Sequence, residues 1–185
     1  MKNLNLLSQY LSVAEFHEKF QLHPFKSLLD MPMDLIQFRE KFIVEEATET
    51  YEAFASRDRH AALDGLVDLC YVSMGTYFLA GGTQYHVETH EPYDFEFLDL
   101  YKMSEGYHLS TDTDFAQLSK LLDICCGCRK IAIDQSFIFD TAFNRVHKAN
   151  MSKVRARSNV EGTRGSVWDV VKPEGWEAPD LHDLV

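Results

Sequence analysis

The segment FIVEEATETYEAF, residues 42–54, decides how the rest of the chain is interpreted, because its acids lie where apolar side chains are expected. The apolar residues that lead into it are spaced by three and four positions, as on the buried face of an α-helix: Leu35, Phe38 and Phe42. The same spacing continues onto acids: Glu45 and Glu49, with Glu46 on the same face. Either these acids form a solvated helix face, or carboxylates stand in the place of core residues.

A second helical pattern repeats this arrangement further along the chain. Its apolar seam contains Tyr71, Gly75 and Phe78, and the same steps taken backwards reach Asp68 and Asp64. Residues four apart are separated by about 40° around a helix. The two aspartates are therefore expected to share one face, continuous with the seam.

The turn between these two helices is expected near Asp58 or Arg59, so that Glu49 and Asp68 lie at similar heights in an antiparallel hairpin. Four or five carboxylates would then converge between packed helices, where unpaired charges cost several kcal/mol each. A bound cation removes this cost, and a ligand set made only of oxygen favours Mg²⁺ or Mn²⁺ over zinc. The alternative is a hydrated helix face, with Asp64 capping the second helix.

A third apolar stripe, near the end of the chain, also leads into polar residues. Phe139, Phe143 and Val146 are followed at the same spacing by Asn150 and Lys153. An amide and an ammonium group beside the acids would suit the phosphate oxygens of a ligand. Alternatively, they form an ordinary helix C-terminus, where a lysine is favoured by the helix dipole.

The periodicity of the chain is almost entirely helical, so we expect an all-α fold, a helical bundle. Helices are expected at about 10–20, from Pro32 to about 57, at 60–80 before Gly81, within 89–108, from Asp114 to about Ile131, and from a cap at Asp134 to about Arg155. We find no repeat or domain boundary, and expect residues 1–185 to form one domain with an irregular, ordered tail at 156–185.

Composition limits the possible partners. The 185 residues carry a formal net charge of −11, which argues against a nucleic-acid polymer as ligand. No apolar run approaches the ~20 residues of a membrane span, and the first residues do not have the form of a signal peptide. We therefore expect a cytoplasmic protein that does not enter the membrane.

The four cysteines are expected to be reduced thiols packed in or near helices, as is usual in the cytosol. Cys70 lies in a helical apolar pattern, and the other three form the motif CCGC: Cys125, Cys126 and Cys128. The spacing of Cys125 and Cys128 also occurs in zinc sites, but a site would need a second ligand pair.

These motifs resemble the all-α nucleoside triphosphate pyrophosphohydrolases, the superfamily of MazG-type proteins, dimeric dUTPases and phosphoribosyl-ATP pyrophosphohydrolases. The resemblance is carried by VAEFHEKF, REKFIVEEATETYEA, ALDGLVDLCYVSMGT and VHKANMSK followed by VVKPEGWEAPDL. The last two are similar to a phage and bacterial branch labelled phosphoribosyl-ATP pyrophosphohydrolase-like. The family motif usually closes with Glu-x-x-Asp, whereas Gly65 stands three residues before Asp68 here. This departure leaves the number of bound metal ions open.

The resemblance implies a MazG-like bundle that hydrolyses a nucleoside triphosphate, a dNTP or a non-canonical NTP, to the monophosphate and pyrophosphate. The implied metal ligands for Mg²⁺, or Mn²⁺, are Glu46, Glu49, Asp64 and Asp68, with help from Glu45. The implied base that activates water is Glu45 or Glu46. The implied phosphate ligands are Asn150, Lys153 and, more weakly, Lys148.

The resemblance also implies a homodimer or homotetramer with the active site near the subunit interface. The tryptophans of the tail, Trp168 and Trp176, would pack either on a neighbouring subunit or on their own bundle. The part of the site that binds the base is not identified by the motifs. His17 and Lys26 are expected to be surface residues, and Arg39 and Lys41 are expected to be surface charges unless they contact phosphate.

The sequence leaves three other interpretations open. A di-iron carboxylate bundle needs two Glu-x-x-His motifs, and the one such spacing found, Glu105 to His108, lies outside the long helices. A helical regulatory protein that kept the fold and lost catalysis is favoured by Gly65. A true phosphoribosyl-ATP pyrophosphohydrolase would need more lysine and arginine near the acids.

Overall fold

The computed structural model describes residues 5–91, 96–105, 114–158, 161–162 and 164–185. Its longer helices are α1 (Leu7–Lys19), α2 (Met33–Ser56), α3 (Arg59–Leu79), α6 (Asp114–Asp134) and α7 (Phe139–Asn150). The shorter elements are η1 (Leu28–Asp30), α4 (Gln84–Thr89), α5 (Phe97–Glu105), β1 (Val154–Arg155), β2 (Val170–Val171) and η2 (His182–Leu184). The chain is mostly helical, which confirms the predicted all-α fold. Of the Glu105–His108 spacing, His108 lies outside the described residues.

The hairpin of α2 and α3 forms the centre of the molecule, and its ends follow from local chemistry. Pro32 precedes α2, and Arg57 ends that helix in the left-handed conformation at φ 60°. The Asp58 side chain then accepts a hydrogen bond from the Ala61 amide at 3.0 Å and caps α3. Both helices agree with the predicted ranges to within a residue. Asp58, and not Asp64, is the capping residue.

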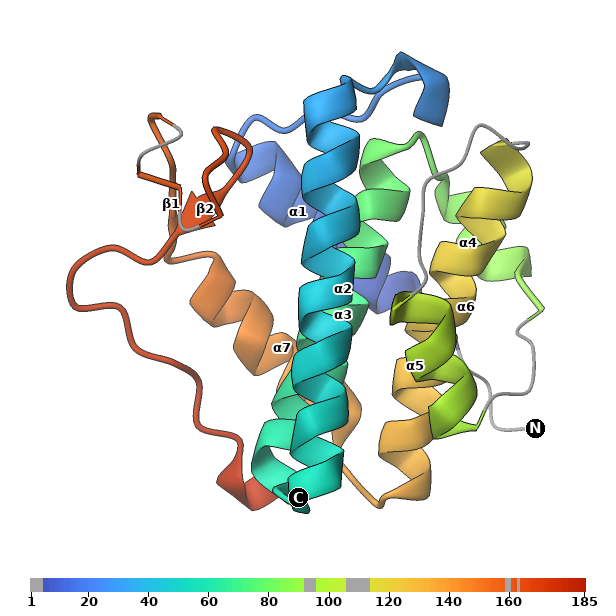
Figure 1. The fold of residues 1–185 in the computed structure, drawn as a ribbon, viewed down its shortest axis with the longest axis vertical. Helices are drawn as coiled ribbons and strands as arrows, with labels where there is room; N and C mark the ends of the chain where they lie inside the picture. The colour runs from blue at the N-terminus through green and yellow to red at the C-terminus, as the bar shows by residue number, and fades with distance from the viewer. Residues whose placement is uncertain (1–4, 92–95, 106–113, 159–160, 163) are drawn as a thin grey trace.

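Helix α3 is buried on almost every side, as expected for a helix that is apolar all around. It packs against α2 and α6 most extensively and also contacts α1 and α7. Six of its large or medium side chains have no exposed surface: Leu63, Leu66, Val67, Cys70, Met74 and Tyr77. Figure 1 shows α4, α5 and α6 on one side of α2, and α7 with the tail on the other.

The prediction that Asp134 caps the last helix was wrong. Asp134 is the final residue of α6, and its carboxylate pairs with Lys130 at 2.9 Å. Ser136 then adopts a left-handed φ of 62°. The amides of Ser136 and Phe137 donate back to the carbonyls of Ile133 and Ala132, a Schellman motif that stops the helix.

Helix α7 consequently begins later than predicted, and it also ends earlier. It spans Phe139–Asn150, so Lys153 follows the helix and Arg155 belongs to β1. Strand β1 pairs antiparallel with β2, with Val154 opposite Val171. This short pairing joins the start of the tail to its middle.

The tail packs on its own bundle. Trp168 Nε1 donates to Asp34 Oδ2 at 2.9 Å, near the start of α2, and Trp176 Nε1 donates to the Ala149 carbonyl at 3.0 Å, near the end of α7. Leu181 and Leu184 at the end of the chain are buried in the main hydrophobic core. The tail is therefore irregular but ordered over its described residues.

The four cysteines are free thiols and all are buried. Burial raises the pKa of Cys126 to about 12 and that of Cys125 and Cys128 well above the usual value, so these thiols stay protonated. The structure thus agrees with packed, reduced cysteines. Among the described helices, none is both long and apolar enough to cross a membrane.

Candidate active site

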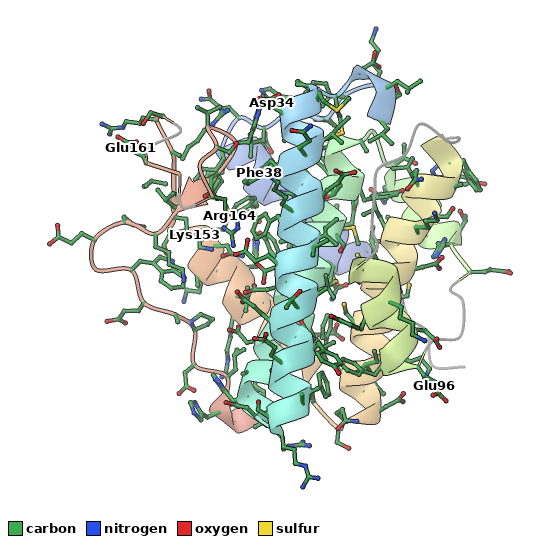
Figure 2. All side chains as sticks on the ribbon, in the orientation of Figure 1. Asp34, Phe38, Glu96, Lys153, Glu161 and Arg164 are labelled. Atoms are coloured by element: carbon green, nitrogen blue, oxygen red, sulfur yellow. The ribbon has the colours of Figure 1, made fainter. Side chains whose placement is uncertain are left out.

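A cavity of about 670 Å³ lies between the α2–α3 hairpin, α1, the end of α7 and the tail. Three of the predicted acids line it: Glu46, Glu49 and Asp68. So do two of the predicted phosphate ligands, Asn150 and Lys153. Figure 2 shows Lys153 near Arg164 in the region between α2 and the tail. The hairpin and the end of α7 therefore bring the three sequence patterns to one place.

Two of the acids that line the cavity resist ionisation, although only Glu46 is buried and Glu49 is exposed. Burial raises the pKa of Glu46 to about 9, and the charges of Asp68 and Glu49 add to the increase. Burial also raises the pKa of Asp68 to about 7, with Asp64 as the next largest cause. The carboxylates are therefore close enough to resist ionising together. A cation bound directly by these carboxylates would lower their pKa values.

The other two predicted acids stand beside the cavity and do not line it. Glu45 is partly exposed and faces the tail, where it forms an ion pair with Arg164. Asp64 lies one helical turn before Asp68, and burial raises its pKa while the charges of His60 and Lys172 lower it. Both acids contribute charge to the site without reaching its interior.

Arg164, in the tail, is a cation of this site that the sequence patterns did not predict. Its Nε and Nη2 donate to the two carboxylate oxygens of Glu45 at 2.8 and 2.9 Å, and Nη2 also reaches Glu46 Oε1 at 3.4 Å. Its guanidinium carbon lies 3.7 Å from the centroid of the Phe42 ring. A forked ion pair above an aromatic ring is a strong arrangement for arginine. The tail thus supplies a counter-ion to the acids of α2.

Asp169 holds this part of the tail in position. It is 2% exposed, and its Oδ2 accepts a hydrogen bond from the Arg164 amide at 3.0 Å. Its carbonyl accepts from the Ala156 amide at 3.0 Å, next to the β1–β2 pairing. The surrounding sequence, GTRGS, has no periodicity that would have predicted where Arg164 lies. This contact depends on the folded tail.

The donor chemistry of the cavity fits a hard divalent cation, because Glu46, Glu49 and Asp68 offer only carboxylate oxygens. Glu46 is 6% exposed, and the contact of its carboxylate with Arg164, at 3.4 Å, is long. Within the described residues, however, no three of these acids bring ligand atoms within 4.8 Å of one another. The chemical type of these residues suits the metal, but their ligand atoms are not gathered around one point. In this conformation the positive charge next to Glu45 and Glu46 is the guanidinium of Arg164.

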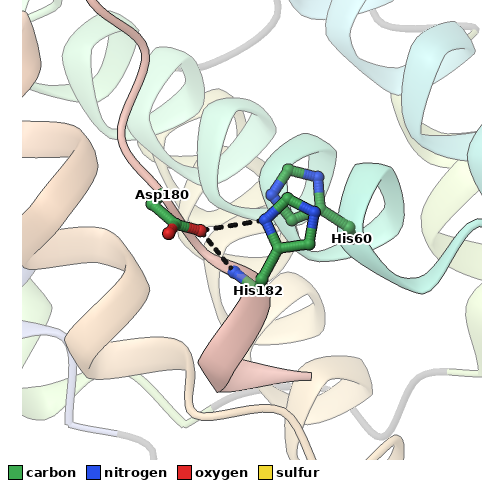
Figure 3. Close-up of side chains that lie close together, drawn as sticks. All are labelled: His60, Asp180 and His182. Atoms are coloured by element: carbon green, nitrogen blue, oxygen red, sulfur yellow. Dashed lines mark hydrogen bonds and ion pairs between the residues drawn. The ribbon is translucent and has the colours of Figure 1, made fainter.

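A different group of metal-ligating side chains lies where the tail ends against the start of α3 (Figure 3). His60, Asp180 and His182 have ligand atoms within 4.8 Å of one another. Asp180 Oδ1 already accepts hydrogen bonds from the His182 amide at 3.0 Å and from His182 Nδ1 at 2.9 Å. The two imidazole rings stack with centroids 4.1 Å apart. These hydrogen bonds and the ring stacking hold the end of the tail against the start of α3, which explains why the three side chains lie together.

Gly65 allows α3 to approach α2 closely. A Cβ atom at this position would lie 2.7 Å from Thr50 Oγ1 and 3.0 Å from the Thr50 Cα atom. Thr50 Oγ1 in turn donates to the Glu46 carbonyl at 2.6 Å. At the position where the Glu-x-x-Asp motif has an acid, this chain has a glycine, and the two helices pack closely there beside Glu46.

The predicted phosphate ligands divide into two groups. Asn150 is buried, and Lys153 has a pKa that burial lowers and the charge of Asp68 raises. Lys172, from the tail, joins them in lining the cavity. Lys148 is exposed and lines a separate hollow with Arg145 and Trp176, so the structure does not bring it to the acids.

Two residues expected at the surface are instead buried in the wall of the cavity. His17 is 2% exposed and Arg39 is 7% exposed, and both line the same space as the acids. Lys26 and Lys41 are exposed, as expected. The sequence did carry a signal: Arg39 lies seven residues, or two turns, before Glu46 on the same helix face.

The fold and the site together define a helical domain with an acidic cavity that is bordered by lysine, arginine and asparagine. Residues 13–87 match the family model of phosphoribosyl-ATP pyrophosphohydrolase, within the MazG-like superfamily, and this confirms the predicted resemblance. The family indicates a hydrolase that acts on the pyrophosphate bond of a nucleotide-like substrate. The match begins within α1, contains α2 and α3, ends within α4, and includes neither α7 nor the tail. No curated protein and no solved structure matches the chain.

Proposed function

We propose that this protein hydrolyses a nucleoside triphosphate, a dNTP or a non-canonical NTP, to the monophosphate and pyrophosphate, with Mg²⁺ as cofactor and Mn²⁺ as a substitute. The observation that carries the proposal is the shared cavity in which Glu46, Glu49 and Asp68 face Asn150 and Lys153. Carboxylates that resist ionising together, next to cationic phosphate ligands, suit metal-assisted phosphoryl chemistry.

Each residue has a distinct part in this scheme. Glu46, Glu49 and Asp68 would hold the metal, which supplies charge neutralisation at the phosphate oxygens. Lys153 and Asn150 donate hydrogen bonds to the phosphates and hold the chain of phosphates in line with the attacking water. Glu45, which stands beside the cavity and outside the ligand set, would accept the proton of that water after it leaves Arg164 and turns into the cavity. If the metal needs fewer carboxylate ligands, Glu46 is the alternative base for the attacking water.

Pyrophosphate release from a panel of canonical and modified nucleotides, with Mg²⁺ or Mn²⁺, tests the proposal. The matched pair of variants is Glu49→Gln, which lines the cavity, and Glu52→Gln, an exposed residue of the same helix that does not line it. Loss of one carboxylate ligand is expected to reduce kcat/KM by at least about 100-fold in Glu49→Gln and to leave Glu52→Gln unchanged. Equal activity of Glu49→Gln and the unaltered protein would contradict the mechanism.

The ion pair of Arg164 favours a second candidate function, a helical binding or regulatory protein. In that case Arg164 is a permanent counter-ion of Glu45 and Glu46, and the close packing at Gly65 replaces a lost metal ligand. Absence of pyrophosphate release from every nucleotide, together with intact folding, supports this function over the first.

We also propose that the protein forms a homodimer or homotetramer, as its resemblance to the superfamily implies. Light scattering after size-exclusion chromatography measures the mass in solution directly. A mass equal to that of one chain would contradict this part of the proposal.

A further inference from the structure

The cavity extends from the acids towards a second set of polar atoms that the phosphate chemistry does not use. Arg39 lies two turns before Glu46 on α2, a distance of about 10 Å along the helix axis. Its Nε donates to Thr76 Oγ1 at 2.9 Å and its Nη2 donates to the Val72 carbonyl at 2.6 Å. This separation is comparable to the reach from the phosphates to the base in an extended nucleotide. The far part of the cavity is therefore placed to receive a base.

Aromatic side chains line this far part. The rings of Phe16, Phe38 and Trp168 all border the cavity. The Phe38 and Phe42 rings pack against each other with centroids 5.7 Å apart. Flat apolar walls of this kind suit a planar heterocycle, and a few polar groups then decide which one is accepted.

His17 contributes a buried acceptor without a partner. Its Nδ1 lies 2.8 Å from the Val13 carbonyl, which can only accept, so Nδ1 carries the hydrogen and Nε2 carries a lone pair. Burial, followed by the charge of Arg39, lowers the pKa of His17 to about 3, and the ring is therefore neutral at physiological pH. Nε2 has no hydrogen-bond partner in the described structure. Such an atom favours a ligand that donates a hydrogen bond.

Arg39 contributes donors beside this acceptor. Burial, followed by the charge of Arg164, lowers its pKa to about 10, so the guanidinium remains charged at neutral pH. Its contacts with Thr76 and Val72 use Nε and one hydrogen of Nη2. Within the described structure, the N–H groups of Nη1 and the second hydrogen of Nη2 are those left to meet a ligand.

Gly75 brings the acceptor and the donors together. A Cβ atom on Gly75 would lie 2.9 Å from His17 Cε1, 3.3 Å from His17 Nε2 and 2.9 Å from Arg39 Nη2. The two side chains therefore meet above the same point of α3. Together they present one neutral acceptor next to a fork of two donors.

We infer that His17 and Arg39 recognise cytosine, so that the substrate is a cytosine nucleoside triphosphate. The 4-amino group of cytosine donates to His17 Nε2, and the Arg39 fork donates to N3 and O2. Among the common bases, cytosine alone presents donor, acceptor and acceptor in this order. Uracil and thymine present acceptor, donor and acceptor, guanine presents acceptor, donor and donor, and adenine lacks the third group. The inference deepens the proposed function and rests on it.

The first experiment compares substrates on the unaltered protein. We expect kcat/KM for dCTP or CTP to exceed that for the uracil nucleotides on the order of 100-fold, because a uracil would face His17 Nε2 with an acceptor and leave buried groups unpaired. The triphosphate of 2-pyrimidinone deoxyriboside, which lacks the amino group alone, should lose most of this advantage. Pyrophosphate release that favours another base would overturn the inference while leaving the proposed function intact.

The second experiment changes the acceptor. His17→Phe removes the lone pair and keeps an aromatic ring, and His23→Phe, at an exposed position outside the cavity, is the matched control. We expect His17→Phe to raise KM for dCTP and remove the discrimination against dUTP with a smaller effect on kcat, and His23→Phe to change neither. Discrimination that survives in a folded His17→Phe protein would overturn the inference.

Binding measurements separate a failure of base recognition from a failure of the proposed function. Calorimetry with dCMP and dUMP does not require turnover. Tighter binding of dCMP that His17→Phe abolishes supports the recognition of cytosine even if pyrophosphate is never released, and it moves the function to binding. Equal binding of the two monophosphates would overturn the inference.

Discussion

At the scale of single residues, the molecule combines carboxylates that resist ionising with cations that are buried beside them. Glu46 is the extreme case, because burial and its neighbours Asp68 and Glu49 raise its pKa from 4.5 to about 9. Such a group destabilises the fold in its charged form. An acid at this position therefore carries a cost to stability, as is common for residues that serve a site.

This cost predicts an unusual dependence of stability on pH. Between pH 4.5 and about 9, folded Glu46 holds a proton that the unfolded chain has released, so the free energy of unfolding falls as pH rises. We expect the Tm of the metal-free protein to decrease from pH 5 to pH 9. Glu46→Gln should flatten this slope, since an amide does not titrate, whereas Glu52→Gln should not.

Thermal scans in the presence of a chelator measure the slope, and added Mg²⁺ gives a second check. A cation that binds the ionised carboxylates should raise the Tm more at pH 8 than at pH 6. Identical slopes for Glu46→Gln and the unaltered protein would show that Glu46 is not the group responsible.

At the scale of elements, the α2–α3 hairpin was predictable and the tail was not. Spacing by three and four residues placed Glu46, Glu49 and Asp68 on facing stripes of two helices, and the short turn between the helices put these acids at similar heights. The start of α7 was mispredicted because Ser136, a residue without a strong left-handed preference, ends α6 in that conformation. The position of Arg164 could not be predicted because it depends on how the tail folds back onto α2, where Arg164 pairs with Glu45. His17 and Arg39 were predicted to lie at the surface and are buried, because a single polar residue in a sequence does not show whether its side chain is exposed.

The tail is expected to compete with metal for the acids of α2. Arg164 occupies both oxygens of Glu45 and lies 3.4 Å from Glu46 Oε1. Arg164→Gln removes this positive charge, and we expect it to tighten Mn²⁺ binding about tenfold in the absence of nucleotide, because Arg164 and the ion no longer repel each other. Arg157→Gln, at an exposed site of the same tail, is the control.

Titration calorimetry of the two variants provides the measurement. Weaker Mn²⁺ binding in a folded Arg164→Gln protein would show that Arg164 supports the ligands and does not compete with the ion. That result would also favour the function in which Arg164 and the acids form a purely structural ion pair.

At the scale of the whole molecule, the tail closes the cavity and also completes the core. It contributes Arg164, Trp168, Asp169 and Lys172 to the cavity wall. Near its end the same segment buries Leu181 fully, and the ion pair of Arg145 with Asp183 anchors it to α7. Because one segment does both, the site and the fold should form and unfold together, as expected for a single domain over residues 1–185.

Leu181→Ala tests this coupling. Removing a buried leucine side chain is expected to lower the free energy of unfolding by about 2–5 kcal/mol, whereas the same substitution at Leu29, which is 69% exposed, should change it by less than about 0.5 kcal/mol. Urea unfolding, followed by both far-UV circular dichroism and tryptophan fluorescence, reports on the helices and on Trp168 and Trp176 separately. In a single domain the two signals change at the same urea concentration, and Leu181→Ala shifts both equally. A fluorescence transition that moves to lower urea while the helical transition stays in place would show that the tail unfolds by itself, and that the cavity can open without loss of the bundle.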